Sequence, residues 1–302
     1  MKRAPTPRPG TGGKGPLIVI GGREERESHE ERKILREVVR LGCRTSGKLL
    51  IVTAATSIPE DVAQAYIATF EDLGAKSVEL LDIRTREDAF DDANLQKLDD
   101  AGCIFFTGGD QLRITSQIGG TPVFRRMLEI HDAGGVIAGT SAGAAAVPET
   151  MLISGASEAS LRVDKLGMAP GLGLLRGVVI DSHFAERGRI GRLLAAVAQN
   201  PYNLGIGIDE DTAFIVEEET RGRVMGSGAV YVIDGRRVSY SSLSERHPEG
   251  IVSVHDLTLH MLCDREAYDL FERRPIPPAG ARRTTVRANG RGGAGAKSRG
   301  SG

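Results

Sequence analysis

The chain of 302 residues contains no run of the roughly 20 apolar residues that a membrane-spanning helix needs. Its first fifteen residues also lack the apolar segment of a secretory signal peptide. With 40% hydrophobic residues, the composition is that of an ordinary globular protein. The sequence therefore predicts a cytoplasmic protein that has no membrane partner.

Cysteine is scarce, and metal-binding patterns are missing. Cys43, Cys103 and Cys263 have no paired spacing, and each lies in or beside an apolar segment, as reduced structural cysteines do. There is no His-Glu-x-x-His motif and no cluster of Cys and His. A metallopeptidase is therefore disfavoured, and we expect no metal and no other cofactor.

Both ends of the chain lack acidic residues. Residues 1–15 carry four basic side chains and residues 275–302 carry six, without any Asp or Glu. Their Pro, Gly, Ser and Arg composition cannot bury much apolar area, so we expect both to be disordered basic tails. The remaining chain has 29 basic and 40 acidic residues, a net charge near −11. Such a surface repels nucleic acid and suits cationic ligands.

Residues 16–274 show no internal repeat and no linker, which favours one domain. Short apolar runs alternate with stretches of helical period, such as Glu31–Leu41 and Val62–Leu73. This alternation predicts an α/β fold of three layers, with an open and mostly parallel sheet flanked by helices. The expected strands are Leu17–Ile20, Leu49–Thr53, Ser77–Leu81, Cys103–Phe106, Val136–Ala138, Val178–Ile180 and Ile206–Ile208.

The pattern changes after Asp211, where strand-like pieces are joined by Gly and Ser turns. These pieces predict antiparallel strands at an edge of the same domain. They are Ala213–Glu217, Arg223–Met225, Ala229–Ile233 and Ile251–Val254.

A serine flanked by glycines is the most informative feature of the sequence. The apolar strand that starts at Val136 runs into Gly139-x-Ser141-x-Gly143, and an Ala-rich helical stretch follows. Strand, sharp turn and helix are the context in which hydrolases expose a nucleophilic serine. The backbone N–H of Ala142, at the helix start, can then stabilise an oxyanion. The alternative is a Gly/Ser loop that binds phosphate or only packs.

A second glycine turn follows the strand Cys103–Phe106 and has the sequence Thr-Gly-Gly-Asp-Gln-Leu-Arg. Turns at the carboxyl ends of parallel strands face one crevice, so this turn can meet the serine. Gly109 is then a candidate second oxyanion donor, and Gln111 is a candidate for binding a substrate amide or carboxylate. Alternatively, Asp110 only caps the next helix.

A general base is sought among six histidines. His183 lies just past the end of the expected strand Val178–Ile180, and catalytic side chains gather at such strand ends. An arrangement like that of the α/β-hydrolases would instead need His255 or His260, and neither lies on a clear strand-to-helix loop. The remaining histidines lie in charge-rich, helix-end or polar loop segments: His29, His131 and His247.

A histidine base needs a third group that fixes its tautomer. Asp209, Glu210 and Asp211 follow the expected strand Ile206–Ile208, and their spacing does not choose among them. The order along the chain is Ser, His, acid, which differs from the order Ser, acid, His of the α/β-hydrolases.

Arg187, Arg189 and Arg192 follow the candidate base, and the last two share a helix face. Guanidinium groups bind carboxylates in a bidentate manner, so a substrate with several carboxylates is expected. The alternative is an ordinary solvated helix face. Asp181 points to the same side of its strand as His183 and is a candidate for binding a cationic substrate group.

These motifs together resemble those of the cyanophycinases, in the serine peptidase family that also contains peptidase E, the aspartyl dipeptidase. The likeness runs from about Gly15 to Phe271 and leaves the tails out. It rests on four motifs in the same order: Gly-Thr-Ser141-Ala-Gly-Ala, Thr-Gly-Gly-Asp-Gln111-Leu, Asp181-Ser-His183-Phe with Arg187-Gly-Arg-x-Gly-Arg192, and Gly-Ile-Asp-Glu210-Asp-Thr-Ala.

The resemblance implies a fold like that of the class I glutamine amidotransferases, and a homodimer. It also implies hydrolysis of cyanophycin, a poly-aspartate chain bearing arginine on each β-carboxyl group, to β-Asp-Arg dipeptides. Ser141 would be the nucleophile, His183 the base and Glu210 the acid of the triad. The implied substrate pocket contains Gln111, Asp181, Arg187, Arg189 and Arg192.

Ser182 departs from the family pattern, because a larger amide residue is common there, and this leaves the fine specificity open. Two further alternatives also stay open. One is an aspartyl dipeptidase or esterase, and the other is a non-catalytic binding protein that resembles the amidotransferases.

Overall fold

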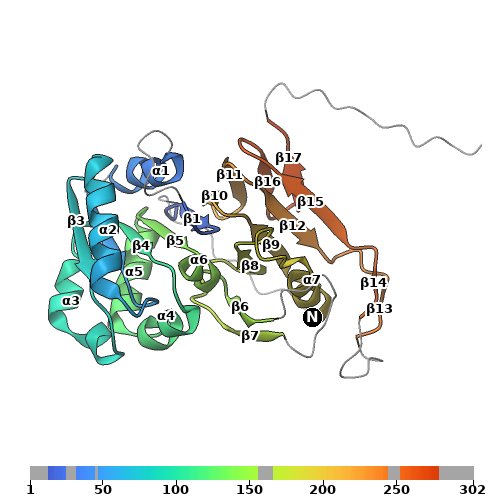
Figure 1. The fold of residues 1–302 in the computed structure, drawn as a ribbon, viewed down its shortest axis with the longest axis horizontal. Coiled ribbons are helices and arrows are strands. Elements are labelled where there is room, and N and C mark those ends of the chain that lie inside the picture. Colours follow the sequence, from blue (N-terminus) through green and yellow to red (C-terminus); the bar gives the residue numbers. More distant parts are fainter. Residues whose placement is uncertain (1–12, 25–31, 45–46, 156–165, 244–251, 279–302) are drawn as a thin grey trace, which may run out of the picture.

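The larger sheet of the molecule has a parallel half. The computed structural model describes residues 13–24, 32–44, 47–155, 166–243 and 252–278. Its nine-stranded sheet contains five parallel strands in the order β1, β5, β4, β2, β3 (Figure 1). They span Leu17–Ile20 (β1), Lys48–Val52 (β2), Ser77–Leu81 (β3), Ala101–Phe106 (β4) and Val136–Thr140 (β5). These strands confirm the expected ones, with ends shifted by one or two residues.

Four antiparallel strands continue this sheet beyond β1. They are β10 (Thr212–Glu217), β11 (Arg221–Gly226), β16 (Ala267–Asp269) and β17 (Arg274–Ile276). The first two confirm expected strands of the antiparallel edge, the last two were not expected, and the expected strand Ala229–Ile233 lies in a second sheet. Strand β17 includes Pro275, which an outermost strand tolerates because one side of its backbone needs no partner. The sheet therefore extends past residue 274, where the expected domain ended.

The N-terminal boundary also differs from the expected one. Lys14 forms an ion pair with Glu219, and the N–H of Gly15 donates to the carbonyl of His131 at 2.8 Å. These contacts tie residues 14 and 15 to the domain. The rest of the two expected tails, residues 1–12 and 279–302, lies outside the described residues.

Two strands that we expected in the parallel sheet lie in a second sheet instead. Strands β8 (Val178–Ser182) and β9 (Leu204–Ile208) pair in parallel and are joined through α7 (Ile190–Gln199). Strands β12 (Val230–Asp234) and β15 (Thr258–Leu262) complete this four-stranded sheet in antiparallel orientation. The expected α/β fold, with a large and mostly parallel sheet flanked by helices, is confirmed, but the assignment of these two strands to that sheet was wrong. A short buried apolar run does not reveal which sheet it joins.

Two small hairpins were not fully expected. Strands β6 (Thr150–Ser154) and β7 (Gly167–Pro170) form one of them, beside α6. Strands β13 (Tyr240–Ser241) and β14 (Val254–His255) form the other. Of the expected strand Ile251–Val254, only Val254 lies in a strand, and Ile251 lies outside the described residues.

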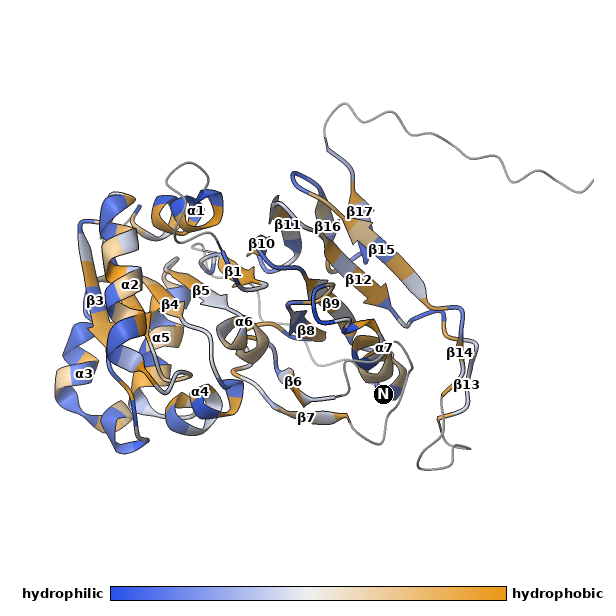
Figure 2. Ribbon diagram, viewed as in Figure 1, coloured by the Kyte–Doolittle hydropathy of each residue, from blue (hydrophilic) through white to orange (hydrophobic). Residues whose placement is uncertain are grey.

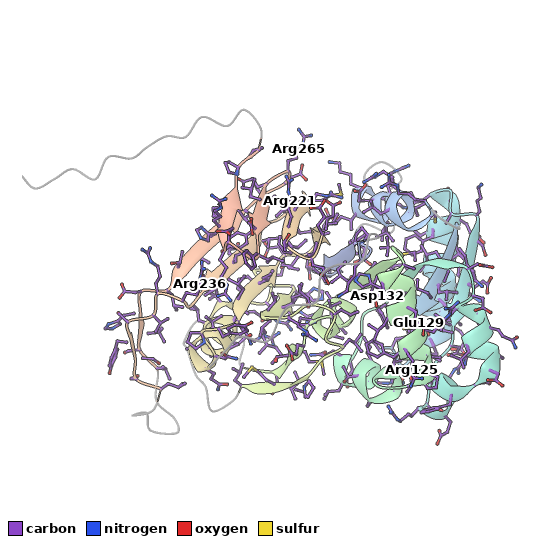
Figure 3. All side chains as sticks on the ribbon, turned by 180° about the vertical axis from the view of Figure 1, so that it is seen from behind. Arg125, Glu129, Asp132, Arg221, Arg236 and Arg265 are labelled. Carbon is purple, nitrogen blue, oxygen red and sulfur yellow. The ribbon has the colours of Figure 1, made fainter. Side chains whose placement is uncertain are left out.

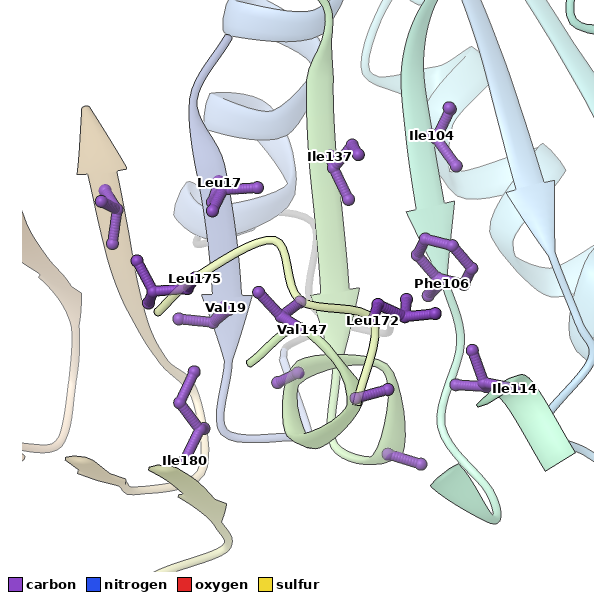
Figure 4. Close-up of a cluster of buried hydrophobic side chains, with 14 of the residues drawn as sticks. Leu17, Val19, Ile104, Phe106, Ile114, Ile137, Val147, Leu172, Leu175 and Ile180 are labelled. Carbon is purple, nitrogen blue, oxygen red and sulfur yellow. The ribbon is translucent and has the colours of Figure 1, made fainter. Parts of the chain in front are cut away.

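Helices cover both faces of the large sheet. Helices α1 (Lys33–Gly42) and α2 (Pro59–Asp72) pack on one face, where Ile18 and Ile20 of β1 point. The other face, with Leu17 and Val19, packs against the remaining helices and the second sheet (Figure 4). Those helices are α3 (Asp92–Lys97), α4 (Gln111–Ile118), α5 (Pro122–Asp132) and α6 (Ala142–Ala146), with a short 3-10 turn at Glu87–Phe90.

Apolar residues concentrate on the central strands and on the inner helix faces, whereas the outer helix faces are hydrophilic (Figure 2). Charged residues of α5, for example Arg125, Glu129 and Asp132, lie on its exposed side (Figure 3). Within the described part of the chain, no helix combines the length and the apolar character needed to cross a bilayer. Helix α6 contacts both β5 and β8, so it lies at the seam between the two sheets.

Candidate active site

Ser141 occupies the turn between β5 and α6, as the sequence predicts. Its φ of 53° lies in the left-handed region, which a residue other than glycine adopts at a cost. The turn is tight, because a β-carbon on Gly143 would lie 2.5 Å from the carbonyl oxygen of Phe106. The serine is only partly buried, so its hydroxyl is accessible at the end of the strand.

His183 lies directly after β8 and contacts the serine. Its Nε2 is 2.8 Å from Oγ of Ser141, and its Nδ1 is 2.7 Å from Oε1 of Glu210. The three side chains form a continuous hydrogen-bonded line, in which the carboxylate orients the ring and the ring faces the hydroxyl. A hydroxyl, an imidazole and a carboxylate so arranged can transfer a proton from serine to histidine.

The structure separates the three carboxylates that spacing alone left open. Asp209 is buried, and its two oxygens accept the backbone N–H groups of Ala185 at 2.9 Å and Ala229 at 3.1 Å. Asp211 accepts the hydroxyl of Ser227 at 2.7 Å. Only Glu210 of the three hydrogen bonds to the histidine among the described residues.

The surroundings of His183 lower its pKa below the ordinary value. Burial of the ring is the main cause, since it penalises the charged imidazolium, and the positive charges of Arg187 and Arg189 act in the same direction. The hydrogen bond that the ring donates to the carboxylate of Glu210 raises the pKa and opposes part of this effect. The imidazole is therefore neutral at neutral pH, which is the form that accepts a proton.

The end of β1 connects the three loops that carry these groups. The carbonyl of Ile20 accepts the N–H of Ser141 at 2.9 Å, and the carbonyl of Gly21 accepts the N–H of His183 at 2.8 Å. The next carbonyl, that of Gly22, accepts the N–H of Asp211 at 2.9 Å. Sequence reasoning missed this segment, although two glycines directly after a buried strand are a signal of close backbone approach.

Gly22 lies directly beneath the imidazole and gives a testable prediction. Its φ is 106°, and a β-carbon there would lie 2.3 Å from Cε1 of His183. Gly22→Ala must therefore displace the ring, and we expect a loss of about 100-fold in kcat, since a shift of about 1 Å costs that much. Hydrolysis measured at saturating substrate checks this.

Gly74→Ala is the matched control for this substitution. Gly74 also has a positive φ, 92°, but no atom lies within 4 Å of the added β-carbon. Both variants place alanine at a positive φ, where it destabilises the backbone by more than about 1 kcal/mol. Equal kcat values for the two variants would contradict the proposed contact between Gly22 and the ring.

A cavity of ≈ 140 Å³ opens beside the serine. Three guanidinium groups and one carboxylate line it, so positive charge is in excess. The structure brings together these candidate residues at the cavity wall: Gly109, Gln111, Ser141, Ala142, Asp181, Arg187, Arg189 and Arg192. Arg187 is exposed and forms no ion pair within the described residues, and Nε of Arg189 is buried without a partner.

Asp181 has different surroundings from those that we expected. Its side chain is 1% exposed, and it accepts hydrogen bonds from Nη1 of Arg189 at 3.1 Å and from Nε of Arg192 at 2.5 Å. Nη2 of Arg192 contacts the same carboxylate. The carboxylate thus already has two cationic partners and holds them in place, which leaves it little capacity for a cationic substrate group.

The second glycine turn lies beside the serine. A β-carbon on Gly108 would be 3.4 Å from Cβ of Ser141. The side chain of Asp110 accepts the N–H of Leu112 at 2.8 Å, which confirms the expected helix cap. Nε2 of Gln111 donates to the carbonyl of Leu152 at 2.7 Å. This contact brings the hairpin of β6 and β7 to the cavity, a wall that sequence reasoning missed.

The other described histidines lie in different environments. His131 is buried, with Nδ1 at 3.2 Å from the carbonyl of Gly135. His255 contacts the ring of Tyr240, and His260 contacts the ring of Tyr268. Each of the two histidines that could serve as the base in an α/β-hydrolase arrangement thus has an aromatic partner, on β13 and β16 respectively. His29 and His247 lie outside the described residues.

Comparison with known proteins places the chain in a family. Residues 17–224 match the model of peptidase family S51. The chain is 36% identical to a cyanophycinase of Trichormus variabilis over 262 residues, which cover 86% of this chain and 87% of that protein. It is 34% identical to a cyanophycinase of Geminocystis herdmanii over 261 residues, covering 86% and 95% respectively.

A solved structure supports the fold. A peptidase from an acI-B1 Actinobacterium superposes with a TM-score of 0.62 at 21% identity, covering 82% of this chain and 97% of that one. Because the family match covers more than half of the chain and the relatives align over most of it, the chain belongs to peptidase family S51.

Proposed function

We propose that this serine peptidase hydrolyses cyanophycin to β-Asp-Arg dipeptides through an acyl-enzyme. The observation that carries the proposal is the hydrogen-bonded line from Ser141 through His183 to Glu210, with contacts of 2.8 and 2.7 Å. Its first member, Ser141, lies at the wall of an arginine-lined cavity. We propose cyanophycin as the substrate because the similar proteins of Trichormus variabilis and Geminocystis herdmanii are named cyanophycinase.

In the proposed reaction, Oγ of Ser141 attacks the carbonyl carbon of the α-peptide bond while Nε2 of His183 takes its proton. Collapse of the tetrahedral intermediate breaks the C–N bond, and His183 returns the proton to the leaving amine. Water then attacks the ester, His183 again accepts and returns a proton, and Ser141 is regenerated. The N–H groups of Ala142 and Gly109 are the proposed donors to the oxyanion.

The charge of the cavity suits this substrate. Each repeat of the polymer carries the free α-carboxylate of an arginine, and such a carboxylate can bind the exposed guanidinium of Arg187 at the cavity wall. Arg192 is occupied by Asp181, which fixes the guanidinium plane rather than leaving it mobile. We therefore assign Asp181 to orienting the arginines that bind the substrate.

The test is a comparison of substrates with purified protein. We expect β-Asp-Arg dipeptides to be released from the polymer faster than Asp-X dipeptides are cleaved at equal peptide-bond concentration. Faster cleavage of Asp-X dipeptides would favour the aspartyl dipeptidase alternative. A serine-directed phosphonate should form an adduct of one phosphonyl group at Ser141, detectable by mass spectrometry. The non-catalytic alternative predicts no adduct.

The pH dependence of kcat/KM tests the role of His183. Activity requires the neutral imidazole, so it falls as the pH drops through the pKa of His183 in the free enzyme. Because that pKa is lowered, we expect the acid limb below the ordinary histidine value of about 6.5. Arg187→Gln removes a charge that lowers the pKa, so the limb should move to higher pH.

Arg126→Gln, on the exposed side of α5, is the control for this change. It removes one positive charge far from the imidazole. We therefore expect the acid limb of its kcat/KM profile at the same pH as in the unaltered enzyme. If the limb stayed in place in Arg187→Gln as well, the proposed electrostatic effect on His183 would be wrong.

Two further parts of the proposal concern the oligomeric state and the cellular location of the protein. We propose a homodimer and a cytoplasmic location, both on the basis of the resemblance to the cyanophycinases. Sedimentation of the purified protein measures the first of these directly.

A further inference from the structure

We propose that Glu24 is a positioning residue that sets the distance between Ser141 and His183, an inference that rests on the proposed function. Glu24 belongs to the segment Ile20–Glu24, which begins at the last residue of β1. It does not line the cavity. It acts through the backbone contacts that this segment makes to the serine, histidine and acid loops.

Glu24 forms a buried bridge between two elements. Its side chain accepts the hydroxyl of Thr140 at 2.6 Å on Oε2 and the hydroxyl of Tyr66, on α2, on Oε1. All three residues are only 3% exposed. A carboxyl group removed from water is costly unless it is hydrogen bonded, so both hydroxyl contacts strongly favour this one position of the side chain.

The bridge connects the two halves of the reacting pair. Thr140 directly precedes Ser141, so one end of the bridge fixes the serine side. The other end is the segment itself, whose Gly21 carbonyl accepts the N–H of His183 at 2.8 Å and whose Gly22 supports the imidazole from beneath. Glu24 therefore couples the position of the ring to the position of the hydroxyl.

The same segment also reaches the acid. The Gly22 carbonyl accepts the N–H of Asp211 at 2.9 Å, and Nη1 of Arg23 lies 3.5 Å from Oε2 of Glu210. A displacement of Glu24 would therefore disturb the histidine and its orienting carboxylate together. A buried group with only a structural role would change stability without changing either of these geometries.

Three variants distinguish a positioning role of Glu24 from a purely structural role. Glu24→Ala removes the bridge. Glu24→Gln keeps it, since the amide oxygen accepts from one hydroxyl while the NH₂ group donates to the other. Thr121→Ala is the control, because Thr121 is also buried. The substitution removes a hydroxyl that donates to the carbonyl of Ile118 at 2.6 Å and accepts the N–H of Phe124 at 3.3 Å, far from the segment Ile20–Glu24.

Two readouts need no substrate. The first is the rate at which a serine phosphonate labels Ser141, and the second is the imidazole pKa of His183 from an NMR titration of isotope-labelled protein. We expect Glu24→Ala to slow labelling about 100-fold, since misplacement by about 1 Å has this effect. The pKa of His183 should rise, because water admitted beneath the ring relieves the burial that lowers it.

Glu24→Gln should label within about threefold of the unaltered protein, because its bridge is complete. Thr121→Ala should lower Tm and change neither readout. The proposal is overturned if Glu24→Ala lowers Tm but leaves the labelling rate and the pKa unchanged. It is also overturned if Glu24→Gln is as slow as Glu24→Ala.

Two further variants decide the matter if Glu24→Ala does not fold. Tyr66→Phe and Thr140→Val each remove one of the two hydroxyl contacts, and each should change both readouts in the same direction by less. Unchanged readouts in both would overturn the proposal. Failure of the proposed function is recognised separately, because an unaltered protein that labels at Ser141 but leaves the polymer intact has a different substrate.

Discussion

Replacement of Ser141 by alanine should reduce turnover of the polymer by about 10⁴-fold or more, since loss of a nucleophile removes the covalent route altogether. The hydroxyl makes its hydrogen bond to Nε2 of His183, and its removal leaves the backbone turn unchanged. We therefore expect the variant to keep its Tm within a few degrees. The rate of dipeptide release, followed by chromatography, measures the loss.

Ser116→Ala is the matched control. Ser116 is an exposed serine of α4 whose hydroxyl donates to the carbonyl of Arg113 at 3.2 Å. The control should turn over the polymer like the unaltered protein and should still form the phosphonate adduct. Appreciable turnover by Ser141→Ala, or an adduct at another residue, would show that a different group attacks the substrate.

The largest expected effect on stability follows from the arginine cluster. Asp181→Asn keeps the shape of the side chain but leaves Arg189 and Arg192, which are 13% and 10% exposed, without a counter-charge. Removing one partner of a buried ion pair costs about 3–5 kcal/mol, because the remaining charge stays desolvated. Urea denaturation should therefore show a clearly lower midpoint with an unchanged slope.

An exposed ion pair gives the comparison for this effect. Glu129 and Arg126 lie 3.0 Å apart with side chains 55% and 41% exposed, and Glu129→Gln should cost less than about 0.5 kcal/mol. Adding Arg192→Met to Asp181→Asn should recover part of the loss, since one unpaired charge disappears. A midpoint in Asp181→Asn as high as in Glu129→Gln would mean that the cluster does not depend on this carboxylate.

The sequence predicts the strands of the fold better than their assembly. The run Leu-Ile-Val-Ile at the start of the domain indicates a strand covered on both faces, and β1 is buried at all four positions. The runs at Val178 and Ile206 have the same character, yet they belong to a second sheet. Apolar character reports burial, whereas the choice of sheet depends on long-range packing around α6 and α7 that no local pattern encodes.

The candidate site also has parts that the sequence predicts and parts that it does not. Ser141 and His183 can be found because their positions at strand ends follow from the architecture. Asp209, Glu210 and Asp211 cannot be told apart in this way, since the direction of each side chain depends on the turn, which gives Asp211 a φ of 47°. The role of Glu24 is equally hidden, because it depends on two hydroxyl groups that lie 42 and 116 residues away.

The division of the site between two sheets has a consequence for the newly made protein. Ser141 belongs to the large sheet, but the imidazole comes 42 residues later and the carboxylate a further 27, both from the smaller sheet. A ribosome therefore synthesises Ser141 before the imidazole and the carboxylate that complete the hydrogen-bonded line. The proposed mechanism then implies that a chain whose translation stops early has no hydrolytic activity, and that hydrolysis begins only once the later strands have emerged and docked.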